Sequence, residues 1–198
     1  MNLILASRSP RRRELLAKFG LEFSVQVLPA VEIEVGEPIA AAETNAVAKA
    51  LPVSEQNPGA LVLGADTIVV LDGRILGKPQ DRPAAADMLR TLSGCQHQVT
   101  TVVALAVDGQ AVRVFSATTD VRFRSLNECD IRAYLATGEP FDKAGAYGIQ
   151  GFGGLLVESI KGCYYNVVGL PLPKLAVELR RFGIEFFPRC TQGGGEGA

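Results

Sequence analysis

Residues Leu61 to Leu71 read Leu-Val-Leu-Gly-Ala-Asp-Thr-Ile-Val-Val-Leu, which is the strongest strand signal in the chain. A run of aliphatic residues of this length is typical of a buried strand, and the Asp72-Gly73 pair that follows it is typical of a hairpin turn. Side chains alternate between the two faces of a strand, so Asp66 points to one face and Thr67 to the other. The stretch therefore predicts a central strand that carries a carboxylate in an apolar setting.

The segments around this strand alternate between hairpins and helices. Two more hairpins are predicted, with strands 99–107 and 110–123 around Asp108-Gly109 and strands 155–160 and 163–168 around Lys161-Gly162. Shorter strands are expected at Leu3–Ala6, Phe23–Val27, Arg74–Leu76 and Ile184–Phe187, helices at Ser9–Gly20, Pro38–Ala50, Asp81–Leu92, Asn127–Ala136 and Leu172–Phe182, and a loop at Pro52–Gly59. Hairpins interspersed with helices indicate an α/β fold with a mixed twisted sheet and flanking helices.

No internal repeat and no linker divides the 198 residues. A chain of this length fits one fold with a single hydrophobic core region. We expect a single domain over residues 1–190 and a disordered tail over the Gly-rich residues 191–198.

The composition excludes several classes of protein. Hydrophobic residues make up 47% and charged residues 21%, which is typical of a globular chain. A net charge of −1 argues against the broad basic surface that duplex nucleic acid requires. The four cysteines lie far apart without a CxxC pair, so we interpret them as reduced thiols. No apolar stretch reaches the length of a membrane span or of a signal peptide core, so no membrane partner and a cytoplasmic location are expected.

Arginines occupy a position that the helix dipole disfavours. Ser9-Pro10 opens a helix, and Arg11, Arg12 and Arg13 fill its first turn, at the positive end of the dipole. Free amides together with guanidinium groups form an anion site, and the hydroxyl of Ser7 adds a donor. The alternative is that these arginines are solvated or paired with carboxylates.

Asp66 is the second departure from the expected pattern. A carboxylate in a buried strand is costly unless it is paired, metal-bound or facing a cleft. With the arginines, Lys49 and Lys78 would complete a site of cations and a carboxylate suited to a polyphosphate. Alternatively, Asp66 is a structural residue bonded to backbone amides, and each lysine is an ordinary surface residue.

The Gly-rich segment 138–154 is the third departure. Glycines let a backbone approach a ligand closely, and Gln150 offers a donor and an acceptor that could read a base edge. The segment lacks the GxxxxGK[ST] pattern of a phosphate loop, and a plain connector is the alternative. His97 is the sole histidine, which excludes a His-rich metal site, and we interpret it as a structural hydrogen-bonding residue near the sheet.

Several longer motifs resemble those of the Maf family of nucleoside triphosphate pyrophosphatases, in the family's order and over nearly the whole chain. They are Ala6–Leu16 (ASRSPRRRELL), Gly64–Val69 (GADTIV), Gly77–Pro79 (GKP), Leu92–Gly94 followed by His97 and Val99, Asp142–Gly151 (DKAGAYGIQG) and Asn166–Pro171 (NVVGLP). One departure lies before Lys49, where Thr44-Asn45-Ala46 stands in place of the family's frequent Arg-Leu-Ala.

The resemblance implies an α/β fold with a central cleft, similar to that of the inosine triphosphatase group. It also implies hydrolysis of a nucleoside triphosphate to the monophosphate and pyrophosphate with a divalent cation, Mg²⁺ or Mn²⁺. By motif match, Asp66 is the proton acceptor. As metal ligands we expect Asp66 and Glu32, although Glu32 lies outside the matched motifs. The residues that match substrate-specificity positions are Arg11, Thr67 and Gln150, and those that match phosphate-contacting positions are Ser7, Arg12, Lys49 and Lys78. The combination of Arg, Thr and Gln is similar to the subgroup that acts on dTTP and UTP.

Two other functions stay open from the sequence. One is a family member that acts on 7-methyl-GTP or another modified nucleotide. The other is a non-catalytic nucleotide or nucleic-acid binder that acts in septum formation or cell-shape control. The expected partner is a nucleoside triphosphate, and a homodimer is left open.

Overall fold

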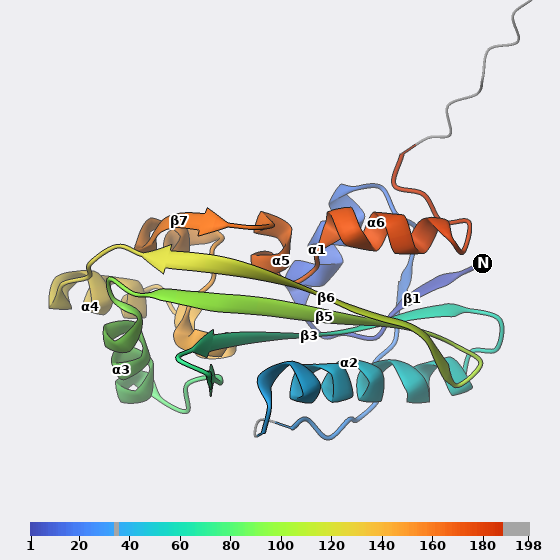
Figure 1. Cartoon of the computed structure of the whole chain (residues 1–198), viewed down its shortest axis with the longest axis horizontal. Helices are drawn as coiled ribbons and strands as arrows, with labels where there is room; N and C mark the ends of the chain where they lie inside the picture. The colour runs from blue at the N-terminus through green and yellow to red at the C-terminus, as the bar shows by residue number, and fades with distance from the viewer. Residues whose placement is uncertain (34–35, 188–198) are drawn as a thin grey trace, which may run out of the picture.

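The computed structural model describes residues 1–33 and 36–187. Its strands form one seven-stranded sheet in the order β2-β1-β3-β5-β6-β7, with β4 paired to β3 off this path (Figure 1). The strands are β1 Leu3–Leu5, β2 Ser24–Val25, β3 Leu61–Leu71, β4 Arg74–Leu76, β5 Gln96–Val107, β6 Gln110–Phe123 and β7 Val157–Lys161. β1 runs parallel to β2 and β3, whereas the other pairs are antiparallel, so the predicted mixed sheet is confirmed.

One edge of β3 is open at its middle. β5 pairs with β3 along one edge from Val62 to Val70. On the other edge, β1 pairs with residues 61–63 and β4 with residues 69–71. Within the part of the chain that the structure describes, no strand pairs with residues 64–68 on that side, and their backbone groups there must find other partners.

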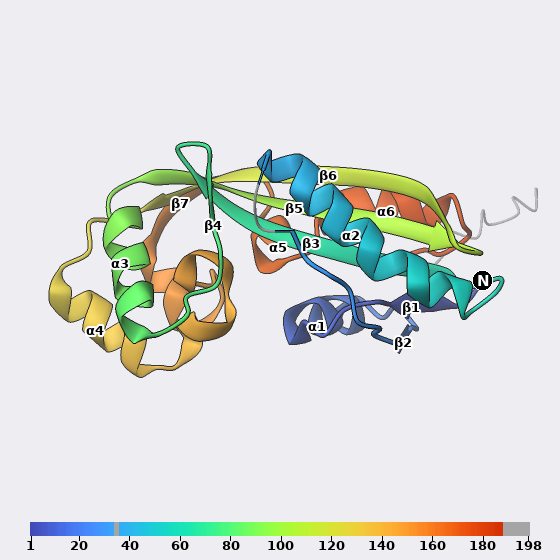
Figure 2. The same cartoon turned by 90° about the horizontal axis from the view of Figure 1, so that it is seen from below.

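Helices cover both faces of the sheet. The α-helices are α1 Pro10–Lys18, α2 Pro38–Glu55, α3 Arg82–Leu92, α4 Glu128–Ala136, α5 Tyr164–Val168 and α6 Leu172–Arg180, and the 3₁₀ helices are η1 Glu139–Asp142, η2 Ala144–Ala146 and η3 Gly151–Leu156. α2 lies along one face, and α1 and α6 lie on the opposite face (Figures 1 and 2). α3 and α4 pack at the far end of the sheet with the 3₁₀ helices (Figure 2).

Two separate hydrophobic clusters share the face of the sheet opposite α2. Ala65 belongs to the cluster under α1 and α6, and Val69 belongs to the cluster under α3 and α4. Thr67, on the same face, lies between the two along β3. The polar pair Asp66-Thr67 therefore interrupts the apolar packing at the middle of the sheet, where the edge of β3 is open.

α2 is longer than predicted. We expected it to end at Ala50 before a loop from Pro52, but the helix continues through Pro52 to Glu55. A proline inside a helix removes one backbone hydrogen bond. Val53 and Ser54, which follow it, are completely buried, and this burial offsets the lost bond.

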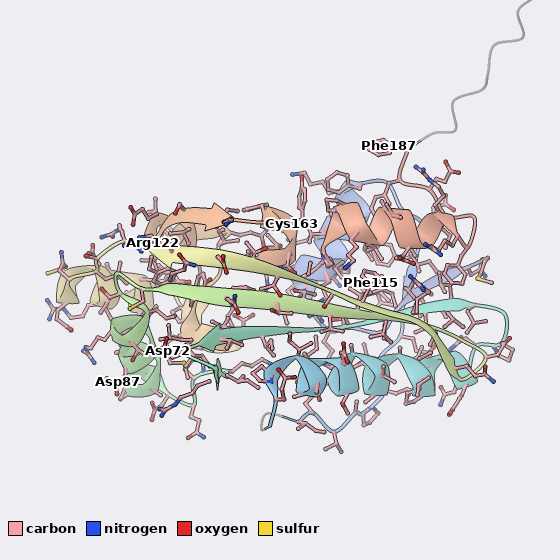
Figure 3. The ribbon with its side chains drawn as sticks, viewed as in Figure 1. Asp72, Asp87, Phe115, Arg122, Cys163 and Phe187 are labelled. Carbon is pink, nitrogen blue, oxygen red and sulfur yellow. The ribbon has the colours of Figure 1, made fainter. Side chains whose placement is uncertain are left out.

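The predicted hairpin at 155–168 is wrong in its second half. Val157–Lys161 forms β7 and pairs with β6, whereas Tyr164–Val168 forms the helix α5. The N–H of Cys163, at the start of α5, donates to Thr119 Oγ1 of β6 at 3.0 Å (Figure 3). This turn toward the sheet lets the buried Asn166 side chain bond to β5 and β6, which a strand in hairpin register with β7 would not allow.

Other expectations have mixed outcomes. The predicted helices at the remaining positions and the long hairpin of β5 and β6 are confirmed, with small shifts at their ends. The predicted strand at Ile184–Phe187 is wrong, because these residues form no strand. The tail 191–198 lies outside the described residues, and the single domain over 1–190 stays a prediction. The described cysteines are free, and no described helix is long and apolar enough to span a membrane.

Candidate active site

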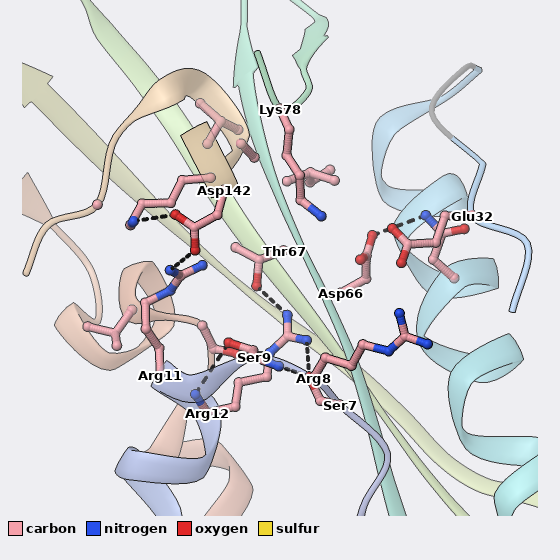
Figure 4. Close-up of a pocket in the computed structure, with 18 of the residues that line it drawn as sticks. Ser7, Arg8, Ser9, Arg11, Arg12, Glu32, Asp66, Thr67, Lys78 and Asp142 are labelled. Atoms are coloured by element: carbon pink, nitrogen blue, oxygen red, sulfur yellow. Dashed lines mark hydrogen bonds and ion pairs between the residues drawn. The ribbon is translucent and has the colours of Figure 1, made fainter. Parts of the chain in front are cut away.

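A pocket of about 860 Å³ lies against the open edge of β3. It is lined by the start of α1, the segment before α2, the middle of β3, the chain after β4 and the Gly-rich segment, and Figure 4 shows side chains from these segments converging. The residues singled out from the sequence all line this pocket: Ser7, Arg11, Arg12, Glu32, Lys49, Asp66, Thr67, Lys78 and Gln150. The fold therefore brings together residues as far apart in the sequence as Ser7 and Gln150, while the role of each residue stays a prediction.

The Asp66 carboxylate is held by two side chains of α2. Lys49 Nζ lies 2.7 Å from Asp66 Oδ1, and Asn45 Nδ2 donates to Asp66 Oδ2 at 3.1 Å. Positions four apart on a helix share a face, which explains how both side chains reach one carboxylate. Asp66 is only 8% exposed, and a carboxylate this buried is tolerated because it is paired and hydrogen-bonded.

Lys49 also joins Asp66 to Glu32. Lys49 Nζ lies 3.2 Å from Glu32 Oε1, so one ammonium group bridges two carboxylates from different segments (Figure 4). The sequence predicts that Lys49 contacts phosphate, but the structure gives this side chain two carboxylate partners. Its cation therefore balances the acidic side of the pocket.

The donors of this acidic side fit a divalent cation that arrives with a nucleotide. Mg²⁺ and Mn²⁺ prefer oxygen ligands, and Mg²⁺ usually takes one or two carboxylates together with substrate phosphates and water. Asp66 and Glu32 supply two carboxylates. Among residues 1–33 and 36–187, no group of three or more His, Cys, Asp or Glu side chains could hold a metal alone.

The Arg12 guanidinium lies beneath the pocket and bonds to the open edge of β3. Its Nη1 donates to Ala65 O at 2.8 Å and to Ser7 Oγ at 3.1 Å, its Nη2 to Thr67 Oγ1 at 2.9 Å, and its Nε to Gly169 O at 3.0 Å. Burial outweighs the raising effect of Asp66 and, together with the nearby Arg11, lowers the pKa of Arg12 to about 10. Four of the five guanidinium N–H groups thus serve protein acceptors, and one remains for a ligand.

Thr67 links Arg12 to β5 through hydrogen bonds. Thr101 Oγ1 donates to Asn166 O at 2.9 Å, so the Thr67 hydroxyl, 2.9 Å from Thr101 Oγ1, is the donor in their contact. Thr67 Oγ1 in turn accepts from Arg12. The chain of bonds runs from Arg12 through Thr67 and Thr101 to Asn166, and it fixes the floor of the pocket.

Cations gather on the side of the pocket formed by the start of α1 and the chain after β4. Arg11 Nη1 lies 3.1 Å from Asp142 Oδ2. Arg8 and Lys78 make no hydrogen bond or ion pair with any described residue, and Figure 4 shows both side chains reaching toward the pocket. Burial raises the pKa of Asp142, but its bonds to Lys143 and Arg11 outweigh this, and the net pKa is lowered.

The Gly-rich segment is held in a fixed shape by Glu139. Its carboxylate oxygens accept from Phe152 N at 3.1 Å and from Gly153 N at 3.2 Å. A Cβ on Gly151 would lie 2.5 Å from Glu139 Oε1, and Gly151 has a φ of +61°, so only glycine fits there. Gln150, the residue before it, has no hydrogen-bond partner among the described residues and lines the pocket, so its amide is free to meet a ligand.

His97 has the structural role that the sequence predicts. Its Nε2 lies 2.7 Å from the Tyr147 hydroxyl, and its ring packs edge-on against Phe123 and Tyr147. Because Tyr147 belongs to the pocket wall, this contact joins β5 to the Gly-rich segment. His97 itself does not line the pocket.

Several residues of the site escaped the sequence analysis. Asn45 could have been found, because it lies four positions before Lys49 on the same helix face. Asp142 and Glu139 belong to the Gly-rich segment, but nothing in their spacing shows which backbone amides or cations they would meet. Arg8 lies within the motif Ala6–Leu16, but nothing in the sequence analysis singles it out.

The motifs that converge on this pocket are also those that a family profile detects. The profile of the "Maf-like protein" family matches residues 2–182. The chain belongs to the Maf family.

Curated Maf relatives match this chain over nearly its whole length. The dTTP/UTP pyrophosphatase of Symbiobacterium thermophilum is 52% identical over 196 residues, which cover 98% of each chain. The dTTP/UTP pyrophosphatase of Thermococcus gammatolerans is 49% identical over 94% of this chain and 100% of that protein. Among solved structures, the dITP/XTP pyrophosphatase of Mycobacterium abscessus aligns with 92% of this chain and 95% of that one, at 19% identity and a TM-score of 0.44. Structural similarity at this level does not bear on the chemistry of the pocket.

Proposed function

We propose that this Maf protein hydrolyses dTTP and UTP to the monophosphate and pyrophosphate, and so limits the incorporation of unwanted nucleotides. The observation that carries the proposal is Asp66, a buried carboxylate that lines the same pocket as Arg8 and Lys78, two cations that are unpaired in the described part of the chain. The names of relatives about half identical to this chain support the choice of nucleotides. We also place the reaction in the cytoplasm, and the homodimer stays a prediction.

The triphosphate binds on the cationic side of the pocket. Arg8 and Lys78 are unpaired among the described residues, and Arg11 exchanges its contact with Asp142 for phosphate oxygens. Ser7 and the remaining N–H of Arg12 add donors at the N-terminus of α1, where the helix dipole also favours an anion. These groups stabilise the negative charge that develops on the pyrophosphate leaving group.

Asp66 is the general base. A water beside its carboxylate loses a proton to Asp66 while its oxygen attacks the α-phosphorus. The bond between the α-phosphorus and the oxygen that bridges to the β-phosphate breaks, and pyrophosphate leaves with that oxygen. Lys49 and Asn45 keep the carboxylate oriented toward the pocket throughout.

A divalent cation completes the site. Asp66 and Glu32 would hold it, because they are the two carboxylates that already share the charge of Lys49. Bound there, Mg²⁺ or Mn²⁺ would neutralise phosphate charge and would make the α-phosphorus a better electrophile.

The base of the nucleotide meets the Gly-rich segment. Uracil and thymine present O4 as an acceptor and N3–H as a donor, and the free amide of Gln150 can satisfy both. Thr67 and Arg11 shape the neighbouring wall, where Thr67 is fixed by its bonds to Arg12 and Thr101.

Replacing Asp66, the proposed general base, tests the proposed function. We expect Asp66→Asn to keep the fold and to lower kcat for pyrophosphate release from dTTP by about 100- to 10,000-fold. Asp87→Asn, on the exposed surface of α3, is the matched control and keeps wild-type kcat. Near wild-type turnover by Asp66→Asn would overturn the role of Asp66. Pyrophosphate release from a panel of canonical and modified nucleotides, with and without Mg²⁺, tests which substrate the protein prefers. Nucleotide binding without metal-dependent turnover would contradict the proposal that the protein is an enzyme.

A further inference from the structure

Asn45 is a buried side chain whose amide oxygen and both N–H groups are hydrogen-bonded at the acidic side of the pocket. It is 3% exposed and comes from the middle of α2. Its Oδ1 accepts from Ile33 N at 2.7 Å, and its Nδ2 donates to Ile33 O at 2.9 Å and to Asp66 Oδ2 at 3.1 Å. An amide group has two N–H donors, and both are used here, so Asn45 has no N–H left to donate to a ligand.

These bonds tie the segment before α2 to the central strand. Asn45 grips both backbone polar groups of Ile33, and Ile33 directly follows Glu32. One helical turn later, Lys49 bridges Glu32 and Asp66. Asn45 and Lys49 thus link the segment that carries Glu32 to Asp66. The positions of the two carboxylates therefore depend on each other.

Asn45 also fixes the rotation of Asp66. A carboxylate that has one bonded oxygen can still turn about its terminal bond. In this site each oxygen has its own donor, Lys49 on Oδ1 and Asn45 on Oδ2, so the plane of the carboxylate is set. The orientation of a general base decides which water it can deprotonate and from which direction that water attacks.

We propose that Asn45 is a positioning residue, which acts through Asp66 and through the backbone beside Glu32 rather than by contact with the nucleotide. The inference rests on the proposed function, because it assumes that Asp66 is the base. It predicts a loss in kcat with little change in KM, since Asn45 bonds to Ile33 and Asp66 and to none of the cations that hold the triphosphate.

Two variants separate this role from general stability. Asn45→Ala removes all three bonds. Asn45→Asp keeps the shape and the acceptor for Ile33 N, but it turns an oxygen instead of an N–H toward Asp66. Ser54→Ala is the matched control, because Ser54 is equally buried on the same helix and its hydroxyl accepts from Gly109 N at 3.0 Å, away from the pocket.

The assay measures kcat and KM for dTTP, together with the melting temperature with and without dTTP in the absence of added metal. We expect both Asn45 variants to lose about 10- to 100-fold in kcat, with KM within about threefold of wild type. They should keep the rise in melting temperature that dTTP causes, since phosphate binding is intact. Ser54→Ala should lose melting temperature but keep kcat.

Three results would overturn the inference: kcat losses no larger than in Ser54→Ala, a loss confined to KM, or a loss of the dTTP-induced rise in melting temperature. If Asn45→Ala does not fold, Asn45→Asp decides alone, because its shape is unchanged. Failure of the proposed function is a different result, since the wild-type protein itself would then release no pyrophosphate from dTTP or UTP.

Discussion

In the proposed function, Gln150 is the residue that recognises the nucleotide base. Changing it to glutamate removes the N–H that can donate to O4 of uracil or thymine and adds a charge near N3–H. We expect Gln150→Glu to lower kcat/KM for dTTP and UTP by about 10- to 100-fold and to narrow their advantage over dCTP, whose amino group suits an acceptor. Gln110→Glu, an exposed change at the start of β6, is the control. An unchanged ratio of dTTP to dCTP would exclude Gln150 from base recognition.

His97 makes the stability of the protein depend on pH. Burial lowers its pKa from 6.5 to about 4, so the unfolded chain binds a proton below pH 6.5 that the folded chain refuses until near pH 4. The stability contributed by the neutral ring is thus complete above pH 6.5 and is lost as the pH falls. We expect the wild-type free energy of unfolding to drop by about 2 kcal/mol more than that of His97→Gln between pH 7 and pH 4.5. Urea unfolding at both pH values checks this, and equal drops would contradict it.

At the scale of elements, a segment was predictable where its local pattern agrees with the packing around it. The eleven residues of β3 and the Asp-Gly turns carry local signals that agree with their tertiary setting. The stretch Tyr164–Val168 is rich in aromatic and β-branched residues, which favours a strand locally. It is a helix because Asn166 must reach Val99 and Thr101 of β5, a requirement that only the folded sheet imposes.

The packing of α2 on β3 leaves no room at Gly64. A Cβ there would lie 2.3 Å from Ala46 O and 2.9 Å from Ala50 Cβ. We expect Gly64→Ala to cost about 1–3 kcal/mol in the free energy of unfolding and to lower kcat, because α2 must move away from the strand that carries Asp66. Ala106→Val overfills the same core cluster beyond the pocket and serves as control, with lost stability but wild-type kcat. Wild-type kcat in Gly64→Ala would show that Asp66 tolerates movement of α2.

At the scale of the whole molecule, the sequence indicated which residues meet but not what each one touches. A net charge of −1 hides a pocket that is lined by several cations and several carboxylates. Arg11 and Arg12 are neighbours of one type, yet Arg11 faces the pocket mouth and Arg12 is buried below it. Burial follows from the packing of α1 against the sheet, which residue spacing alone does not reveal.

This difference gives a prediction for the molecule as a whole. Arg12 joins α1 to the open edge of β3 and to the turn between α5 and α6, through Ala65, Thr67 and Gly169. We expect Arg12→Met to lose about 3–5 kcal/mol in the free energy of unfolding, because buried acceptors are left unpaired. Arg11→Met should lose at most about 1 kcal/mol, since its ion pair is partly exposed, while its KM for dTTP rises.

Arg12→Lys separates charge from geometry in the same experiment. A lysine keeps the charge but presents a single ammonium group, which cannot serve acceptors on three sides as the planar guanidinium does. It should therefore lose nearly as much stability as Arg12→Met in urea unfolding. If Arg12→Met were as stable as Arg11→Met, the hydrogen bonds of Arg12 would not hold α1, the open edge of β3 and the turn between α5 and α6 together. Arg12 would then serve the triphosphate alone.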